Sequence, residues 1–118
     1  MKVKVCVVDH DLTSRGFLRE CLEREGLEVA LCSSGFEAKQ FLSKDSCHVF
    51  ILNIDNPGVR NKDLIVGIKK AAQSRILLLV SERGDSFLKD AMDLGVYGFI
   101  HRPFNLQEVC TMVNHLVR

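Results

Sequence analysis

The chain has 118 residues, of which 47% are apolar and 26% are charged, and its formal net charge is +1. This length fits one domain, and this composition is ordinary for a globular protein. The balanced charge argues against a basic nucleic-acid-binding face, and no apolar run approaches the length of a membrane span. We therefore expect one domain over residues 1–118 that neither binds nucleic acid directly nor enters a membrane.

Five cysteines lie within apolar segments, and no two of them have the C-x-x-C spacing. They are Cys6, Cys21, Cys32, Cys47 and Cys110. This pattern predicts small buried side chains with free thiols, as expected in a reducing compartment. The first residues already have a strand pattern rather than that of a signal peptide, so we expect a cytoplasmic protein.

The first half of the chain alternates between extended and helical patterns. Strands are predicted over residues 2–8, 27–32 and 48–53, and helices begin near Leu12 and Ser34. Gly26 is a natural helix stop, and Ser34 with Glu37 has the spacing of a capping box. The strand over residues 48–53 is too apolar for a half-exposed strand, so we expect it to be buried on both faces, with Asn53 at its carboxyl end.

The second half repeats this alternation. The sequence predicts helices over residues 62–72 and 86–94, strands over 76–80 and 97–101, and a last helix capped by Asn105. Five alternating strands and helices indicate an α/β fold of three layers, with helices on both faces of a doubly wound parallel sheet. The common flavodoxin-like strand order is 2-1-3-4-5, which places a crevice between the first and third strands.

Ligands of open parallel sheets bind at the carboxyl ends of the strands. The residues predicted at this edge are Asp9, Asn53, Ser81 and Arg102, with His10 and Asp11 close by. Asp11 is also a suitable N-cap for the first helix, and a surface position is the simplest interpretation of His10.

Four motifs carry a resemblance that covers essentially the whole chain. They are VVDHD at residues 7–11, ILNIDNPG at 51–58, ILLLVSE at 76–82 and LGVYGFIHRPF at 94–104. With them the chain resembles a response-regulator receiver domain of the two-component, CheY-like family. The resemblance implies a phosphoryl switch: an acceptor aspartate, acidic residues that hold Mg²⁺, a Ser or Thr, a Lys and an aromatic residue. It also implies a cis peptide bond between Arg102 and Pro103.

This sequence departs from the family pattern at most of these positions. Asn53 stands at the acceptor position, His10 follows Asp9 in the acidic pair, and Arg102 replaces the lysine. The hydroxyl position is Val80 or, one residue later, Ser81, and the aromatic position is Phe99. A neutral amide forms no acyl phosphate, and a single carboxylate with a histidine suits Mg²⁺ poorly. We therefore expect no cofactor and no metal, and we expect Arg102 to bridge to Asp9.

The first functional hypothesis is a degenerate member of the family, a pseudo-receiver without enzymatic activity. It would act by docking through the fourth helix, the fifth strand and the fifth helix to a second copy, an output domain or a histidine kinase. Four departures together favour a natural change at Asn53 over an engineered one. Whether the chain is the N-terminal domain of a longer protein stays open.

The alternative is a phosphorylatable receiver that controls a DNA-binding output domain. In that case Asn53 replaces an aspartate by engineering, or Asp55 serves as a displaced acceptor. A third hypothesis is an anion-sensing domain, in which Arg102 and the amides after the third strand hold a sulfate or phosphate.

Overall fold

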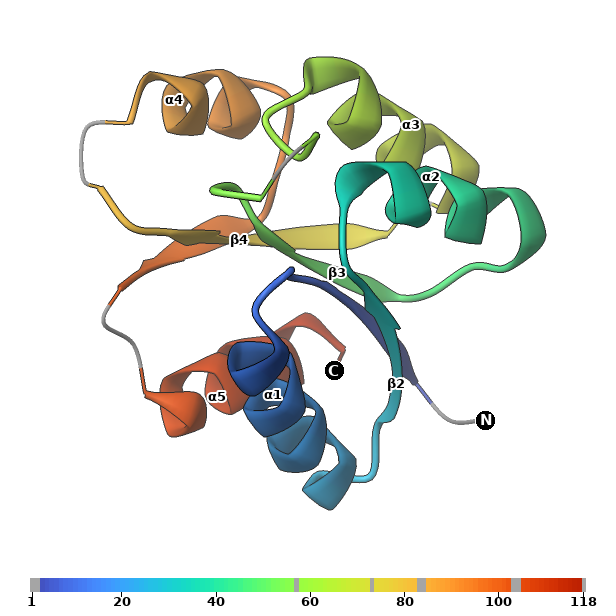
Figure 1. Cartoon of the computed structure of the whole chain (residues 1–118), viewed down its shortest axis with the longest axis vertical. Helices are drawn as coiled ribbons and strands as arrows, with labels where there is room; N and C mark the ends of the chain where they lie inside the picture. The colour runs from blue at the N-terminus through green and yellow to red at the C-terminus, as the bar shows by residue number, and fades with distance from the viewer. Residues whose placement is uncertain (1–2, 57, 73, 83–84, 103–104, 118) are drawn as a thin grey trace.

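The computed structural model describes residues 3–56, 58–72, 74–82, 85–102 and 105–117. Five strands and five helices alternate along these residues (Figure 1). The strands are β1 (Lys4–Val8), β2 (Glu28–Cys32), β3 (Val49–Asn53), β4 (Arg75–Val80) and β5 (Gly98–His101). The helices are α1 (Leu12–Arg24), α2 (Gly35–Lys44), α3 (Lys62–Ala72), α4 (Ser86–Asp93) and α5 (Leu106–Leu116). No helix within the described residues is both long enough and apolar enough to span a membrane.

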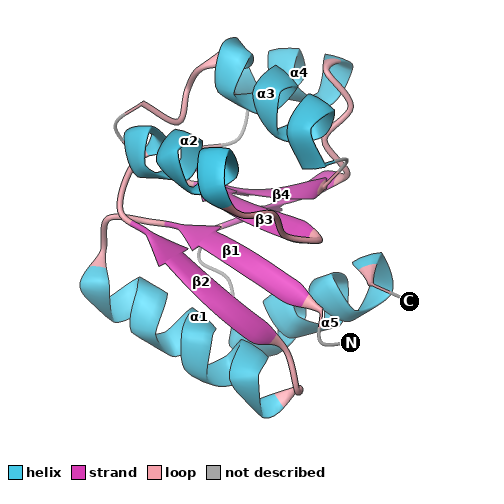
Figure 2. Cartoon of the chain, turned by 90° about the vertical axis from the view of Figure 1, so that its right-hand side faces the viewer, coloured by secondary structure: helices cyan, strands magenta, loops and turns pink. Residues whose placement is uncertain are grey.

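The strands form one parallel sheet in the order β2-β1-β3-β4-β5. Helices α2, α3 and α4 cover one face of this sheet, and α1 and α5 cover the other (Figure 2). The predicted three-layer α/β fold and its strand order are therefore confirmed. This order leaves β1 and β3 side by side at the centre, with their helices on opposite faces.

The core lies in two layers, one on each face of the sheet. Cys6 and Val8 of β1 contact the layer under α2, α3 and α4, whereas Val5 and Val7 face α1 and α5. All five residues of β3 are buried, which confirms the prediction from its apolar run. Because a central strand is covered on both faces, it needs apolar side chains at consecutive positions rather than at alternate ones.

The predicted helix ends are largely confirmed. Asp11, Ser34 and Asn105 are N-caps whose side chains accept hydrogen bonds from backbone N–H groups of the first turn. Gly26 and Gly95 follow helices with positive φ angles of 83° and 93°, a backbone conformation that glycine adopts without strain.

Some details of the predicted elements differ from the structure. The strands predicted over residues 27–32, 48–53 and 97–101 each begin one residue later than expected. Two large apolar side chains on helices are exposed: Phe17 at 54% and Met92 at 40%. Each lies at the border of the apolar stripe of its helix, where a small rotation of the helix decides burial. The predicted cis bond before Pro103 lies outside the described residues.

A close backbone approach positions the loop after β3. Gly58 has a φ of 78°, and a Cβ atom on Gly35, the first residue of α2, would collide with the Gly58 carbonyl oxygen. Any larger residue at position 35 would therefore push this loop away from α2. The loop carries Asn56, so this contact places a polar side chain beside the end of β1.

One prediction about the cysteines is wrong. Cys6, Cys32 and Cys47 are free and buried, as expected, but Cys21 and Cys110 are joined in a disulfide between α1 and α5. These two residues are 89 positions apart in the sequence, so no short motif reveals the pair. They meet because both helices pack on the same face of the sheet.

Candidate functional site

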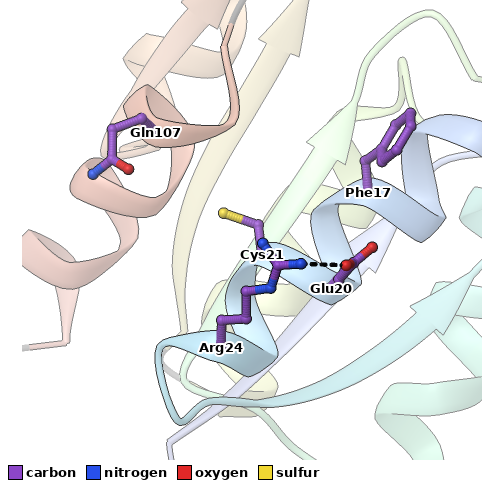
Figure 3. Close-up of a pocket in the computed structure, with 5 residues that line it drawn as sticks. All are labelled: Phe17, Glu20, Cys21, Arg24 and Gln107. Atoms are coloured by element: carbon purple, nitrogen blue, oxygen red, sulfur yellow. Dashed lines mark hydrogen bonds and ion pairs between the residues drawn. The ribbon is translucent and has the colours of Figure 1, made fainter.

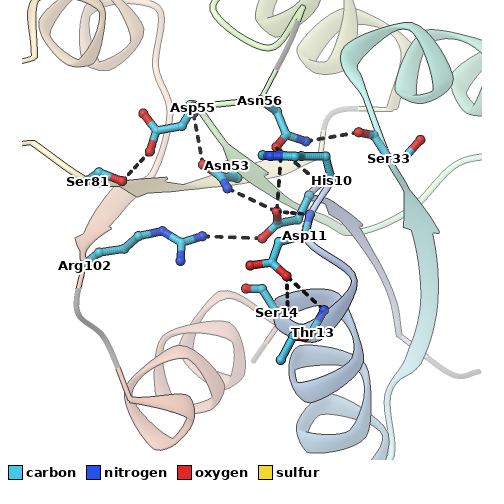
Figure 4. A network of polar contacts seen from close by, with 11 residues as sticks. His10, Asp11, Thr13, Ser14, Ser33, Asn53, Asp55, Asn56, Ser81 and Arg102 are labelled. Carbon is cyan, nitrogen blue, oxygen red and sulfur yellow. Dashed lines mark hydrogen bonds and ion pairs between the residues drawn. The ribbon is translucent and has the colours of Figure 1, made fainter.

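Four strand ends bring polar residues to the carboxyl edge of the sheet. Asp9 directly follows β1, Asn53 ends β3, Ser81 follows β4, and Arg102 follows β5. Figure 4 shows the labelled side chains of Asn53, Ser81 and Arg102 converging on this edge from three different strands. The predicted crevice residues therefore do lie together, but they divide into two separate clusters.

The first group, which we call the buried cluster, consists of Asp9, Asn53 and Arg102. Asp9 is fully buried and Asn53 is 4% exposed. Oδ1 of Asp9 accepts hydrogen bonds from Asn53 Nδ2 at 3.2 Å and from the backbone N–H of Asp11 at 3.0 Å. Nη2 of Arg102 lies 3.5 Å from Asp9 Oδ2. A buried carboxylate is tolerated only when it is paired and hydrogen-bonded, and this cluster supplies both.

The contact between Arg102 and Asp9 is the bridge predicted from the sequence. The two partners differ in exposure: the Arg102 side chain is 30% exposed, whereas that of Asp9 is fully buried. Asp9 directly follows β1, which lies between β2 and β3 in the sheet. The arginine reaches the carboxylate from the rim.

Both ends of the Asn53 side-chain amide have hydrogen-bond partners. Its nitrogen donates to Asp9, and its Oδ1 accepts from the backbone N–H of Asp55 at 3.0 Å. An aspartate in this place could not donate to Asp9 while ionised, and it would set a second negative charge against the first. The amide therefore turns a contact that would be repulsive between carboxylates into a hydrogen bond.

Asn56 is part of the site, although the sequence analysis did not identify it. It is 3% exposed, and its Oδ1 accepts from the His10 backbone N–H at 3.1 Å and also contacts His10 Nδ1. Its Nδ2 donates to the Ser33 carbonyl oxygen at 3.3 Å. Asn56 thus ties together the loops that follow β1, β2 and β3. In the sequence Asn56 stands between two loop residues, Asp55 and Pro57, and this position does not indicate that its side chain is buried.

The second group, which we call the surface cluster, consists of Asp55, Arg60, Ser81 and Asp85. The Ser81 hydroxyl donates to Asp55, and Arg60 Nη2 lies 3.5 Å from the other Asp55 oxygen. Arg60 Nη1 donates to Asp85 at 2.7 Å. The Arg60 guanidinium, by hydrogen-bonding this carboxylate, holds the pKa of Asp85 below its ordinary value, and Asp85 in turn raises the pKa of Arg60. Arg60 also was not identified from the sequence.

The remaining predicted positions do not join the crevice. The Asp11 carboxylate accepts from the backbone N–H groups of Thr13 and Ser14, so it caps α1 instead of entering the acidic pocket. Val80 is fully buried, and at the hydroxyl position it offers no polar atom. Phe99 is 43% exposed on β5. The only carboxylate inside the buried cluster is that of Asp9.

These residues fit a magnesium ion poorly. Mg²⁺ prefers oxygen ligands in octahedral geometry, and carboxylates are the strongest of them. Both oxygens of Asp9 and the oxygen of Asn53 already have protein partners. Among the residues that the structure describes, no group of three or more His, Cys, Asp or Glu side chains is placed to hold a metal ion. That this chain lacks the magnesium site of the family remains a prediction. It is supported by the oxygens of Asp9 and Asn53, which already have protein partners.

Comparisons with known proteins agree with this geometry. The family model described as the response regulator receiver domain matches residues 5–114. A CheY-like receiver domain from Methanospirillum hungatei superposes with a TM-score of 0.89 at 16% identity, over 98% of this chain and 93% of that one. A response regulator from Thermotoga maritima gives a TM-score of 0.86 at 19% identity, over 99% and 98% of the two chains. At these identities the structures support the fold.

Two curated relatives are longer proteins. The "Probable transcriptional regulator ycf29" of Pyropia yezoensis is 27% identical over 99% of this chain and 54% of its own length. The transcriptional regulatory protein CpxR of Escherichia coli is 24% identical over 98% of this chain and 49% of its own length. The chain therefore spans about half the length of the curated relatives it matches.

Proposed function

Because the chain belongs to the response regulator receiver domain family, we propose that it is a receiver of two-component signalling that accepts no phosphoryl group and acts by docking to protein partners. One observation carries this proposal. At the acceptor position the Asn53 amide donates to the buried Asp9 carboxylate, where phosphoryl transfer requires an ionised nucleophile. The proposal includes no enzymatic activity.

The surroundings of Asn53 support the same conclusion. Arg102 pairs with Asp9, so the cation that would meet a phosphoryl group is already engaged inside the protein. The Ser81 hydroxyl is likewise engaged by the Asp55 carboxylate. A phosphoryl group would therefore need both contacts to break before it gained any stabilisation from them.

An acyl-phosphate donor provides the direct test. We would incubate the chain with acetyl phosphate and Mg²⁺ and measure the intact mass, and we expect no phosphoryl adduct. The matched variant is Asn53→Asp, which restores the carboxylate and leaves every other residue in place. An adduct on the variant alone would assign the loss to position 53, whereas a stoichiometric adduct on the unchanged chain would refute the proposal.

Asp55 is the alternative acceptor, and the same experiment examines it. One Asp55 oxygen accepts from Ser81 and the other lies near Arg60, and its side chain is 36% exposed. An adduct that disappears in Asp55→Asn would show a displaced acceptor and favour a phosphorylatable receiver. We expect Asp55 to remain unmodified, since its partners neutralise it without orienting a metal ion.

We further propose that docking uses the face formed by α4, β5 and α5. Three large apolar side chains are exposed on its α4 and β5 part: Met92 at 40%, Tyr97 at 52% and Phe99 at 43%. The resemblance to receiver domains implies that this face binds partners, and the candidates are a second copy, a histidine kinase or an output domain. The greater length of the transcriptional regulators supports an output domain in a longer protein.

Self-association tests the first of these partners. We expect the chain to form dimers at high concentration in light scattering, and the double variant Tyr97→Ser, Phe99→Ser to stay monomeric. Phe36→Ser is the matched control, because Phe36 is 68% exposed but lies on α2, away from the proposed face. A monomer at every concentration would contradict a homodimer and leave the output domain and the kinase as candidate partners.

A further inference from the structure

Helices α1 and α5 contact each other on one face of the sheet, and a cysteine from each lies at this contact. Cys21 and Cys110 are joined in a disulfide, with their Cα atoms 7.0 Å apart. Figure 3 shows the Cys21 sulfur pointing from α1 toward the helix that carries Gln107. The bond therefore links the first helix of the chain to the last.

The two cysteines differ in their access to solvent. Cys110 is 1% exposed. Cys21 is partly exposed and lines a pocket of about 400 Å³, together with Phe17, Glu20, Arg24 and Gln107. A small reagent in this pocket reaches the sulfur of Cys21, while Cys110 lies behind it in the core.

The pocket lining contains one positive and one negative side chain, which pair with each other. Arg24 lies three residues after Cys21 and therefore on the same side of α1. Its guanidinium pairs with Glu20 at 2.5 Å at the edge of the pocket (Figure 3). Because these two charges offset each other, neither strongly repels a small reagent from the sulfur of Cys21, whose thiolate is the form that attacks disulfides.

The other three cysteines lack this access. Cys6 and Cys32 have their sulfur atoms 3.6 Å apart, but both lie in the sheet core, as does Cys47. Contact with Cys32 and burial raise the pKa of Cys6, so it stays a thiol. None of the three lines the pocket beside α1. These cysteines serve as an internal reference for unreactive thiols in the same protein.

We propose that Cys21 and Cys110 form a reversible thiol–disulfide site, which low-molecular-weight disulfides oxidise through the pocket beside α1. The Cys21 thiolate attacks one sulfur of the reagent, and the other sulfur leaves as a thiolate. The Cys110 thiolate then attacks the Cys21 sulfur of the mixed disulfide and releases the second reagent thiol. Two protein thiols are oxidised, one reagent disulfide is reduced to two thiols, and the protons pass to the leaving thiolates.

Oxidation should change how firmly α1 is held to the rest of the domain. The link closes a loop across 89 positions of sequence, which restricts the unfolded chain strongly. We expect the oxidised chain to melt about 10 °C above the reduced chain. In a reducing compartment such a bond forms only when the thiol pool is oxidised, which makes it a signal rather than a permanent link. The proposal is independent of whether the receiver is phosphorylated.

Glutathione buffers of defined ratio provide the test. The reduced chain is equilibrated with reduced and oxidised glutathione, free thiols are trapped by alkylation, and intact mass and peptide mapping identify the bond. We expect an intramolecular Cys21–Cys110 bond that forms and breaks as the ratio changes. A bond between Cys6 and Cys32, only intermolecular bonds, no bond, or a bond insensitive to the ratio would each overturn the proposal.

Single variants test the order of the two steps. In Cys110→Ala the second step is blocked, so a mixed disulfide with glutathione should accumulate on Cys21. In Cys21→Ser the buried Cys110 should remain a thiol, and in the control Cys32→Ser the Cys21–Cys110 bond should form as in the unchanged chain. Glutathione on Cys110 instead of Cys21 would refute the assigned role of the pocket. Far-ultraviolet circular dichroism of each variant verifies that it is folded.

Discussion

The buried cluster and the surface cluster both lie at the carboxyl edge of the sheet, and they pair carboxylates with arginines in different surroundings. In the buried cluster Asp9 is fully enclosed, and its partners are an amide, a backbone N–H and Arg102. In the surface cluster the Asp55 and Arg60 side chains are 36% and 43% exposed. Pairing is therefore obligatory at Asp9, because no water can replace a lost partner there. At Asp55 and Arg60, water can replace a lost hydrogen-bond partner.

Under the proposed function, this difference gives a reason why the departures from the family pattern would occur together. A second carboxylate at position 53 would need a metal ion to offset its charge beside Asp9. The asparagine removes that need, and Arg102 then completes the pairing of Asp9 without a metal. Under the proposed function, the same change lowers the charge of the site and leaves it without a nucleophile. Substitutions in the two clusters measure how far this argument holds.

The largest effect is expected for Asn53→Asp. The introduced carboxylate would replace the amide nitrogen that lies 3.2 Å from Asp9 Oδ1. Repulsion between the two raises the pKa of the introduced carboxyl in the folded state, so the free energy of unfolding should fall by roughly 3 kcal/mol at pH 7. Because a raised folded-state pKa penalises the charged form, the loss should grow between about pH 4 and pH 7. Urea unfolding at several pH values measures it.

Asn56→Asp is the matched control for this variant. Asn56 is also buried, but its side chain contacts His10 instead of a carboxylate. We expect Mg²⁺ to restore part of the stability of Asn53→Asp and to leave Asn56→Asp and the unchanged chain unaffected. Equal losses in the two variants, with no response to Mg²⁺ in either, would mean that burial alone and not Asp9 causes the cost.

A smaller loss is expected for Arg102→Met, which removes the cation but keeps most of the apolar side chain. Asp9 would then keep the hydrogen bonds from Asn53 and from the Asp11 backbone but lose its arginine partner. Because the carboxylate remains buried, the free energy of unfolding should fall by about 2 kcal/mol. Arg102→Lys retains the charge and should lose less. Urea unfolding at pH 7 compares them, and a methionine variant as stable as the parent would contradict the assigned role of Arg102.

The corresponding variant in the surface cluster is Arg60→Met, which removes the partner of both Asp55 and Asp85. The Arg60 and Asp55 side chains are 43% and 36% exposed, so water can replace the contact between them. Asp85, which is 6% exposed, keeps the hydrogen bond from the Phe87 backbone N–H. We expect a loss of at most about 1 kcal/mol, clearly below that of Arg102→Met under the same conditions. A larger loss at Arg60 than at Arg102 would reverse the ranking of the two clusters.

The fold could be predicted from the sequence because its signals are local. An unbroken apolar run such as residues 76–80 indicates a strand that is buried on both faces. An N-cap residue such as Asp11 shows to within one turn where a helix begins. The order of the sheet then follows from general rules for parallel strands. The bridge between Arg102 and Asp9 was predictable for the same reason, since both residues follow strands at one edge of one sheet.

The details that could not be predicted depend on contacts between distant segments. Asn56 is buried in a loop that Gly35 and Gly58 bring against α2, and neither glycine signals this in the sequence. Arg60 is hydrogen-bonded to Asp85, which lies 25 positions away in the sequence, and Cys21 is bonded to Cys110, which lies 89 positions away. In each case one partner lies in a loop or on a helix surface, where side-chain direction depends on packing that periodicity does not encode.

The smallest effect is expected from Asp85→Asn, observed through acid unfolding. Hydrogen bonds from Arg60 and from the Phe87 backbone lower the pKa of Asp85 in the folded state below its ordinary value of about 3.9. A lowered pKa contributes stability above the unfolded-state value, and that contribution is lost as the pH falls through the folded-state value. Asparagine keeps the N-cap of α4 but cannot titrate, so the variant should be slightly less stable than the parent at pH 7, and the difference should shrink below about pH 4. Paired urea unfolding curves at pH 7 and pH 3 measure this difference. A gap that stays constant or widens in acid would mean that the charge of Asp85 contributes nothing and that the surface cluster is held by hydrogen bonds alone.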